Sequence, residues 1–264
     1  MGQIQISNLT IEYKLLKGEG TFKAVDNVSL TVEAGELVTV VGSSGCGKST
    51  LLLAIAGLVE TSRGSINVAG KPITGPGPDR AVVFQESSLL PWKTVLGNVR
   101  FALEMRRWSA GDLNERAMRA IQMVGLESFA DYHPHQLSGG MRQRVNIARA
   151  LAVDPAVLLM DEPFGALDAQ TREVMGEELL RIWERDRKTA LFVTHDIDEA
   201  VLLADKVVVM GRNPGHIKDV MKIDLPRPRR GDVADSAQFI EYRRRLRSHL
   251  ASDMAAMHLV REAV

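Results

Sequence analysis

The most informative part of the sequence reads Gly42-Ser43-Ser44-Gly45-Cys46-Gly47-Lys48-Ser49-Thr50. It follows an apolar run at 37–41 and precedes another at 51–56, which predicts a buried strand, a glycine-rich loop and a helix. Glycines let successive N–H groups turn toward an anion, and the helix adds unsatisfied N–H groups and the positive end of its dipole. Lys48 is suited to the β- and γ-phosphates of a nucleotide, and the Ser49 hydroxyl to Mg²⁺. These nine residues, the phosphate loop, therefore predict a nucleotide site rather than a plain glycine-rich turn.

Composition sets the class of protein. The chain has 264 residues, 45% hydrophobic and 25% charged, which is typical of a globular protein with one large domain or two small ones. Lysine plus arginine, 33, equals aspartate plus glutamate, 33, so no overall charge points to nucleic acid. The single cysteine excludes an internal disulfide and suits a reducing compartment. No apolar run is long enough to span a bilayer, so we expect any membrane role to come through a partner.

Two kinds of strand pattern indicate an α/β fold. Alternating apolar residues at 4–13 and 28–32 favour an antiparallel layer, with a polar loop expected at 14–23. Continuous apolar runs separated by helical patterns predict a mainly parallel sheet covered on both faces. These runs lie at 37–41, 81–84, 157–160, 190–193 and 207–210. Between about 88 and 152 the pattern is largely helical, which predicts an inserted helical subdomain.

Two acids follow one of the buried runs. Asp161 and Glu162 come directly after 157–160, so we expect both carboxylates at the carboxyl edge of the sheet, where α/β proteins bind ligands. Asp161 is suited to hold Mg²⁺ through water with Ser49, and Glu162 to orient and polarise the water that attacks a γ-phosphate. A solvated acidic strand end is the alternative, and the preceding phosphate loop weighs against it.

A second candidate anion site lies at 137–144. Ser138 is a good helix N-cap, and Gly139 and Gly140 would let an anion approach the amides of the helix that follows. Taken alone, this segment is explained equally well by a capped helix.

Six motifs occur in one order, and together they resemble the ATP-binding subunit of ABC transporters from about Ile4 to Leu225. They are Gly42–Thr50, Gln85, Leu137–Arg144, Asp161-Glu162, Ala166-Leu167-Asp168 and His195. The resemblance implies a P-loop NTPase (RecA-like) domain over residues 1–225, with a mainly parallel sheet, an antiparallel β layer and the helical subdomain. It also implies ATP and Mg²⁺ as cofactors and ATP hydrolysis coupled to transport.

The resemblance assigns roles around the nucleotide. Tyr13 resembles the aromatic residue that stacks on adenine, and Phe22 is a weaker candidate. Gln85 resembles the residue that contacts Mg²⁺ and the attacking water while linking catalysis to the membrane partner. His195 resembles the histidine that contacts the γ-phosphate and positions the water with Glu162.

The same resemblance implies a homodimer. Ser138 and Gly140 would contact the γ-phosphate of the ATP held by the other subunit, and Gly139 and Asp168 are also assigned to nucleotide binding. Two-fold symmetry then gives two identical composite sites, which ATP closes and hydrolysis opens.

Finer resemblance points to importers of nitrate, sulfonate, taurine and related small solutes, on the segments 85–92, 161–168 and 213–215. It implies an integral-membrane permease, a periplasmic or extracellular solute-binding protein, and a peripheral location at the cytoplasmic face of the cell (inner) membrane. An importer of another solute, an exporter or a lipoprotein-releasing complex stays open as an alternative.

The C-terminal part, 226–264, differs in character. Residues 226–231 read as a basic linker broken by prolines. Apolar residues then recur at helical spacing at Phe239, Tyr242, Leu246, Leu250, Met254 and Met257, with four arginines between 243 and 247. We expect this helix to pack its apolar stripe on the main domain with its basic face in solvent. Contact with anionic lipid is the alternative.

Two further expectations concern single side chains. The electropositive loop should favour the thiolate of Cys46, so we expect thiol alkylation that inactivates the ATPase and that Mg-ATP blocks. An inert Cys46 that packs as a small apolar residue beneath the loop is the alternative. Leu89, Leu90 and Trp92 follow Gln85 in a proline-containing loop, where they face either a partner groove or the core of the helical subdomain.

Overall fold

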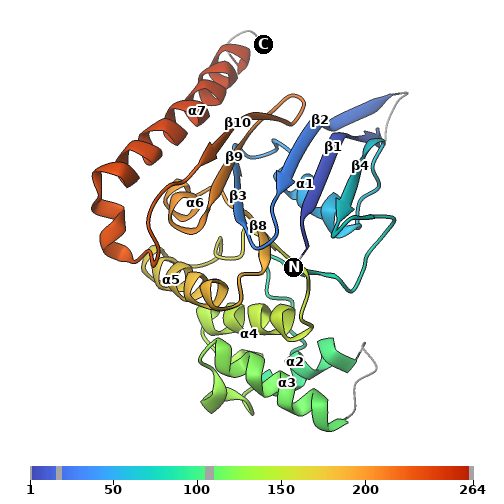
Figure 1. The fold of residues 1–264 in the computed structure, drawn as a ribbon, viewed down its shortest axis with the longest axis vertical. Helices are drawn as coiled ribbons and strands as arrows, with labels where there is room; N and C mark the ends of the chain where they lie inside the picture. The colour runs from blue at the N-terminus through green and yellow to red at the C-terminus, as the bar shows by residue number, and fades with distance from the viewer. Residues whose placement is uncertain (1, 16–19, 105–109, 262–264) are drawn as a thin grey trace.

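A computed structural model describes residues 2–15, 20–104 and 110–261 (Figure 1). Its centre is a six-stranded sheet in the order β10-β9-β3-β8-β7-β6. The strands are β3 (Leu37–Gly42), β6 (Arg80–Val83), β7 (Val157–Asp161), β8 (Thr189–Val193), β9 (Lys206–Gly211) and β10 (His216–Lys222). Five of them run parallel, and their residues are almost all buried, as strands covered on both faces must be. The predicted parallel sheet is confirmed; the antiparallel edge strand β10 has no counterpart among the predicted strands.

The antiparallel layer is a separate four-stranded sheet in the order β2-β1-β4-β5. It consists of β1 (Ile4–Lys14), β2 (Thr21–Val32), β4 (Arg63–Val68) and β5 (Lys71–Pro72). Ile6 pairs with Leu30 on one side and Ile66 on the other, and all three are buried. This buried face covers α1 (Lys48–Ala56), the helix that follows the phosphate loop. β1 and β2 extend into the predicted 14–23 loop, because Tyr13 pairs with Phe22 and Lys14 with Thr21.

The helical subdomain lies below the central sheet in the view of Figure 1, as three packed helices. They are α2 (Val95–Glu104), α3 (Ala110–Met123) and α4 (Gly139–Ala152), with short 3-10 turns η1 (Glu127–Phe129) and η2 (Pro134–Gln136). The fully buried Asn98 fixes the preceding loop, since its side chain accepts from Leu90 N at 2.8 Å and donates to Lys93 O at 3.0 Å. The predicted helical character of this region is confirmed.

Three helices and a turn complete the other face of the sheet. They are α5 (Ala169–Asp186), α6 (Ile197–Leu203), η3 (Gly231–Asp235) and α7 (Ala237–Arg261). Phe239 and Leu246 are buried in one apolar cluster with α6 and β9, and Tyr242 and Leu250 pack partly against it. The apolar stripe of α7 therefore packs on the main domain as expected. Met254 and Met257 lie beyond the residues whose side chains the structure describes.

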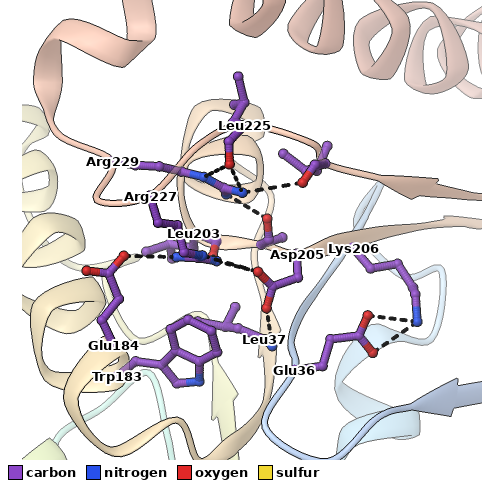
Figure 2. Close-up of polar contacts among 12 residues, drawn as sticks. Glu36, Leu37, Trp183, Glu184, Leu203, Asp205, Lys206, Leu225, Arg227 and Arg229 are labelled. Carbon is purple, nitrogen blue, oxygen red and sulfur yellow. Dashed lines mark hydrogen bonds and ion pairs between the residues drawn. The ribbon is translucent and has the colours of Figure 1, made fainter.

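The segment predicted as a basic linker is docked through two arginines, the arginine clasp (Figure 2). Arg229 is 3% exposed, and its guanidinium donates to the α6 carbonyls of Val201 and Leu202 and to Ala204 O, at 3.2, 3.1 and 2.6 Å. The last carbonyls of a helix have no partner within the helix, so these bonds satisfy them. Burial lowers the pKa of Arg229 to about 10, with the positive charge of Arg227 adding to the effect.

Arg227, the second arginine of the clasp, joins three elements. It lies over the Trp183 ring of α5 at 4.5 Å and donates to the Asp205 carboxylate at 2.8 Å. Asp205 also accepts a hydrogen bond, at 3.0 Å, from the backbone N–H of Leu37, the first residue of β3. The clasp thus connects the C-terminal segment to the strand that carries the phosphate loop. Among the described residues, no helix combines the length and apolar character needed to cross a membrane.

Candidate active site

Glycine geometry shapes the phosphate loop between β3 and α1. Gly45 and Gly47 have φ angles of 77° and 91°, in the left-handed region that L side chains disfavour. A Cβ on Gly47 would lie 2.9 Å from Ala24 O, and one on Gly42 would lie 2.5 Å from Sγ of Cys46. The loop therefore needs glycine at these positions for conformation and for close approach.

Lys48 and Ser43 give the loop its anion-binding character. Lys48 is 6% exposed, and its Nζ donates to Gly42 O at 2.8 Å and Ser43 O at 3.3 Å. The Ser43 hydroxyl oxygen is buried and makes no hydrogen bond to any described residue. A curled backbone with a buried cation and an unsatisfied hydroxyl fits a bound phosphate group.

Ser49 and Asp161 lie together, as the sequence predicts. The Ser49 hydroxyl donates to Oδ1 of Asp161 at 3.0 Å. Burial raises the pKa of Asp161, and this bond together with the positive charge of Lys48 opposes that rise. A hydroxyl and a carboxylate next to a phosphate site are hard oxygen donors of the kind Mg²⁺ prefers, so the residues present fit that ion.

Glu162 and His195 form the second predicted pair. β7 and β8 are neighbours, so the residues after them meet at one edge of the sheet. Oε2 of Glu162 lies 3.0 Å from Nδ1 of His195. Glu162 has a φ of 44°, which is uncommon for a residue with a side chain, and its backbone N–H donates to Val193 O at 2.9 Å. Such strain gathers at functional sites.

These residues surround one cavity of about 490 Å³, within the range of small-molecule sites. Its lining is Tyr13, Phe22, Ala24, Ser44, Gly45, Gly47, Lys48, Ser49, Thr50, Glu162 and His195. Tyr13 and Phe22 are directly paired across β1 and β2, and both are exposed. The structure thus gives Phe22, the weaker candidate from the sequence, the same placement as Tyr13. Only the strand pairing reveals this.

Gln85 is not among the residues that line this cavity. It lines a second cavity of about 410 Å³ with Leu89, Arg142 and Leu167. A Cβ on Gly165 would lie 2.9 Å from Nε2 of Gln85, so the carboxamide rests against the loop after Glu162. The role of Gln85 toward Mg²⁺ stays a prediction.

Ser138, Gly139 and Gly140 lie at the start of α4, outside the lining of the first cavity. Ser138 caps α4 by accepting from Met141 N at 3.2 Å. A Cβ on Gly140 would lie 3.1 Å from Cγ2 of Thr171, which places this helix start beside the start of α5.

Asp168 is the N-cap of α5. Its carboxylate accepts from the backbone N–H and the hydroxyl of Thr171, at 2.9 and 2.7 Å, and these bonds lower its pKa. Ser138, Gly140 and Asp168 thus gather at the starts of α4 and α5, and Asp168 too lies outside the lining of the first cavity. This separation is what a composite site between two subunits requires.

The expected reactivity of Cys46 is contradicted by its burial. Its side chain is fully buried and packs in the apolar cluster beneath the loop, directed toward Gly42. The expected ready alkylation of this thiol is therefore not supported, because no reagent reaches a fully buried sulfur without an opening of the loop.

The loop after Gln85 divides between the two expected roles. Leu89 packs against the core of the helical subdomain, Leu90 is half-buried, and Trp92 is 71% exposed. Leu89 therefore belongs to the core of the helical subdomain, and Trp92 lies at the surface.

Solved structures with the same fold include two of the bacterial ABC transporter cassette MJ0796. Its dimeric structure has a TM-score of 0.73 at 35% identity and covers 84% of this chain and 100% of that one. Its post-hydrolysis dimer, bound to ADP and Pi, matches with a TM-score of 0.73 at 34% identity.

Sequence comparison finds the same family. An uncharacterised ABC transporter ATP-binding protein of Methanocaldococcus jannaschii is 50% identical over 96% of this chain and 92% of its own length. The bicarbonate transport ATP-binding protein CmpD of Synechocystis is 50% identical over 87% of this chain and 82% of its own length. The nitrate import ATP-binding protein NrtC of Synechococcus elongatus is 45% identical over 91% of this chain and 37% of its own length. A model of the ABC transporter family matches residues 25–165. The chain belongs to the ABC transporter family, as an ATP-binding and ATP-hydrolysing subunit.

Proposed function

We propose that the chain drives uptake of a small solute, such as nitrate, bicarbonate, a sulfonate or taurine, through a separate membrane permease. The observation that carries the proposal is the joint placement of Lys48, Glu162 and His195 around one cavity, in a chain similar to bicarbonate and nitrate transport proteins. Residues 1–225 form the ATP-binding domain in this proposal, and 226–264 a C-terminal extension.

Each residue around the cavity has a chemical task. The phosphate loop and Lys48 bind the phosphates, and Tyr13 with Phe22 offers aromatic surface to the adenine. Ser49 and Asp161, with Gln85, would hold Mg²⁺, which neutralises phosphate charge when bound. The Glu162 carboxylate orients and polarises the attacking water, and His195, held 3.0 Å from it, contacts the γ-phosphate.

A homodimer completes the site. Ser138, Gly139, Gly140 and Asp168 lie apart from the cavity of their own chain, so we assign them to the ATP of the partner subunit. The dimeric structures of the similar cassette MJ0796 support this arrangement. Closure around two ATP molecules and release after hydrolysis give a two-state motion for a partner to follow.

The membrane partner would sit over the second cavity. Gln85 and Leu89 line it, and Trp92 is exposed in the same loop. A permease segment that contacts this loop places the chain at the cytoplasmic face of the cell (inner) membrane. A periplasmic or extracellular solute-binding protein would deliver the solute.

The test is to purify the intact complex from membranes and to identify its subunits. Its ATPase rate is then measured in vesicles with nitrate, bicarbonate, taurine and an alkyl sulfonate, one at a time. Stimulation by one of these solutes supports the proposal. A complex that contains no permease, or one whose ATPase responds to lipoprotein instead, contradicts it.

A further inference from the structure

One guanidinium contacts two loops of the active site from outside the nucleotide cavity. Arg172 lies in the first turn of α5, and its backbone N–H donates to Asp168 O at 2.9 Å. Its Nη2 donates to the Leu167 carbonyl at 3.0 Å. Arg172 therefore fixes the Asp168 loop, residues 166–168, by both its backbone and its side chain.

The same side chain reaches the loop that carries His195. Nη1 of Arg172 donates to Oδ2 of Asp196 at 3.2 Å. Its Nε lies 3.5 Å from Oε1 of Glu199, an ion pair without hydrogen-bond geometry. Asp196 is the N-cap of α6, because its other oxygen accepts from the N–H groups of Asp198 and Glu199 at 2.8 and 3.1 Å.

Glu199 also contacts Thr194, the residue that precedes His195. The Thr194 hydroxyl donates to Oε2 of Glu199 at 2.6 Å and accepts from Asp196 N at 2.9 Å. Thr194 is 2% exposed, and its backbone N–H donates to Val40 O of β3 at 3.1 Å. The residues on both sides of His195 are thus held directly or indirectly by Arg172.

We propose that Arg172 is a positioning residue for His195, which ties the Asp168 loop to the His195 loop (residues 194–196) and holds the His195 imidazole against Glu162. The Arg172 guanidinium donates to a carbonyl of the Asp168 loop and to the Asp196 carboxylate of the His195 loop, and it pairs with Glu199 in the first turn of α6. A shift of either loop must therefore move the other or break these contacts. Arg172 does not line the nucleotide cavity, so we expect it to act on turnover rather than on ATP binding. A misplacement of about 1 Å at a reacting group costs up to roughly a hundredfold in rate.

The inference rests on the proposed role of His195, so the test is a double-mutant cycle. Mg-ATP hydrolysis by the purified full-length protein is measured for the wild type, Arg172→Met, His195→Ala and the double variant. We expect Arg172→Met to lower kcat by roughly ten- to a hundredfold with KM unchanged. In the His195→Ala background the same change should cost nothing further, because the imidazole through which it acts is gone. Arg172→Lys, which keeps the charge, should recover part of the loss.

Arg181→Met is the matched control. Arg181 lies on the same helix and pairs only with the neighbouring Glu178, at 2.8 Å, among the contacts of the described residues. We expect it to leave kcat unchanged. If Arg172→Met does not fold, Glu199→Gln replaces it in the cycle, since it removes the ion pair and keeps the shape.

Three outcomes overturn the inference. They are equal losses in both backgrounds, a raised KM with an unchanged kcat, and a folded Arg172→Met protein with full activity. A His195→Ala variant with wild-type kcat contradicts the proposed role of His195 itself. A slow His195→Ala variant with additive losses contradicts only the role of Arg172.

Discussion

At the scale of single residues, Glu162 combines three properties that its neighbours lack. It follows a buried strand, its backbone is in the left-handed region at a φ of 44°, and its carboxylate contacts His195 at 3.0 Å. The carboxylate of Asp161, one residue earlier, is instead bonded to Ser49. Adjacent acids thus contact different partners, because β7 ends at Asp161 and the left-handed backbone of Glu162 turns the chain at the next residue.

Glu162→Gln should separate binding from hydrolysis. Glutamine keeps the shape but cannot act as a base, so we expect steady-state hydrolysis to fall by at least about a hundredfold with ATP binding retained. The measurements are phosphate release and equilibrium ATP binding. Lys48→Ala is the comparison, and there we expect binding itself to weaken. Turnover near that of the wild type in the glutamine variant would contradict the assignment.

Glu199 should make stability depend on pH. Burial raises its pKa from 4.5 to about 7, while the Thr194 hydrogen bond and the Arg172 charge oppose this and Asp196 adds to it. The folded state therefore favours the neutral acid, and ionisation of Glu199 lowers the free energy of unfolding by its full amount above about pH 7. This destabilisation decreases as the pH falls from about 7 toward 4.5.

The comparison protein for this effect is Glu199→Gln, which does not titrate. Its stability relative to the wild type should rise between pH 5 and 8, by up to about 3 kcal/mol from the size of the pKa shift. Urea unfolding of both proteins at several pH values measures the difference. If the difference in unfolding free energy between the two proteins is the same at every pH in this range, Glu199 does not titrate in this way.

At the scale of secondary-structure elements, α6 is held at both ends by residues from distant parts of the chain. Arg172 binds its N-cap and first turn, and Arg229 binds the carbonyls at its C-terminal end. α6 spans only residues 197–203 and begins directly after the His195 loop. A helix this short is marginal alone, so its position depends on these tertiary contacts.

Arg229→Met should destabilise the protein strongly. The change leaves buried carbonyls at the end of α6 without donors, and each unsatisfied buried group costs about 1–3 kcal/mol. We expect the free energy of unfolding to fall by roughly 3 kcal/mol, measured by urea denaturation. Arg230→Met is the control, because Arg230 is exposed. Equal effects of the two changes would contradict the role of the arginine clasp.

At the scale of the whole molecule, our proposal assigns the two cavities to two different partners, the nucleotide and the permease. The first takes its lining from the phosphate loop, β1, β2 and the loops after β7 and β8, and the second lies between the Gln85 loop, α4 and the loop after Glu162. The loop at 163–167 contributes to the lining of the second cavity, and it directly follows Glu162, which lines the first cavity. In our proposal, the nucleotide therefore lies next to the surface that contacts the permease.

Trp92→Ala should uncouple transport from hydrolysis. Trp92 is 71% exposed, so its loss should leave the melting temperature and basal ATPase of the isolated subunit unchanged and lower solute uptake by the complex. Leu89→Ala is the paired variant, and we expect it to lower the melting temperature because Leu89 packs against the helical core. A Trp92→Ala complex with full uptake per ATP would contradict the proposed docking surface.

The amino-acid sequence was enough to predict the phosphate loop, the two acids after β7 and the helical insertion. These features follow from local rules: glycine conformations, strand and helix periodicity, and the meeting of parallel strands at one edge. The role of His195 beside Glu162 was expected only from the resemblance to ABC transporter ATP-binding subunits. The two side chains meet because both residues lie just after neighbouring strands of one parallel sheet.

Three features became visible only in the folded chain: the direction of the Cys46 side chain, the position of Phe22 beside Tyr13, and the burial of Arg229. The same is true of the bridge that Arg172 makes between two loops. Each depends on contacts between residues far apart in the chain, and such contacts leave no local periodicity. An arginine in a basic run is usually solvated. Arg229 is buried instead, because the carbonyls at the end of α6 have no donor within the helix and a buried carbonyl must be hydrogen-bonded.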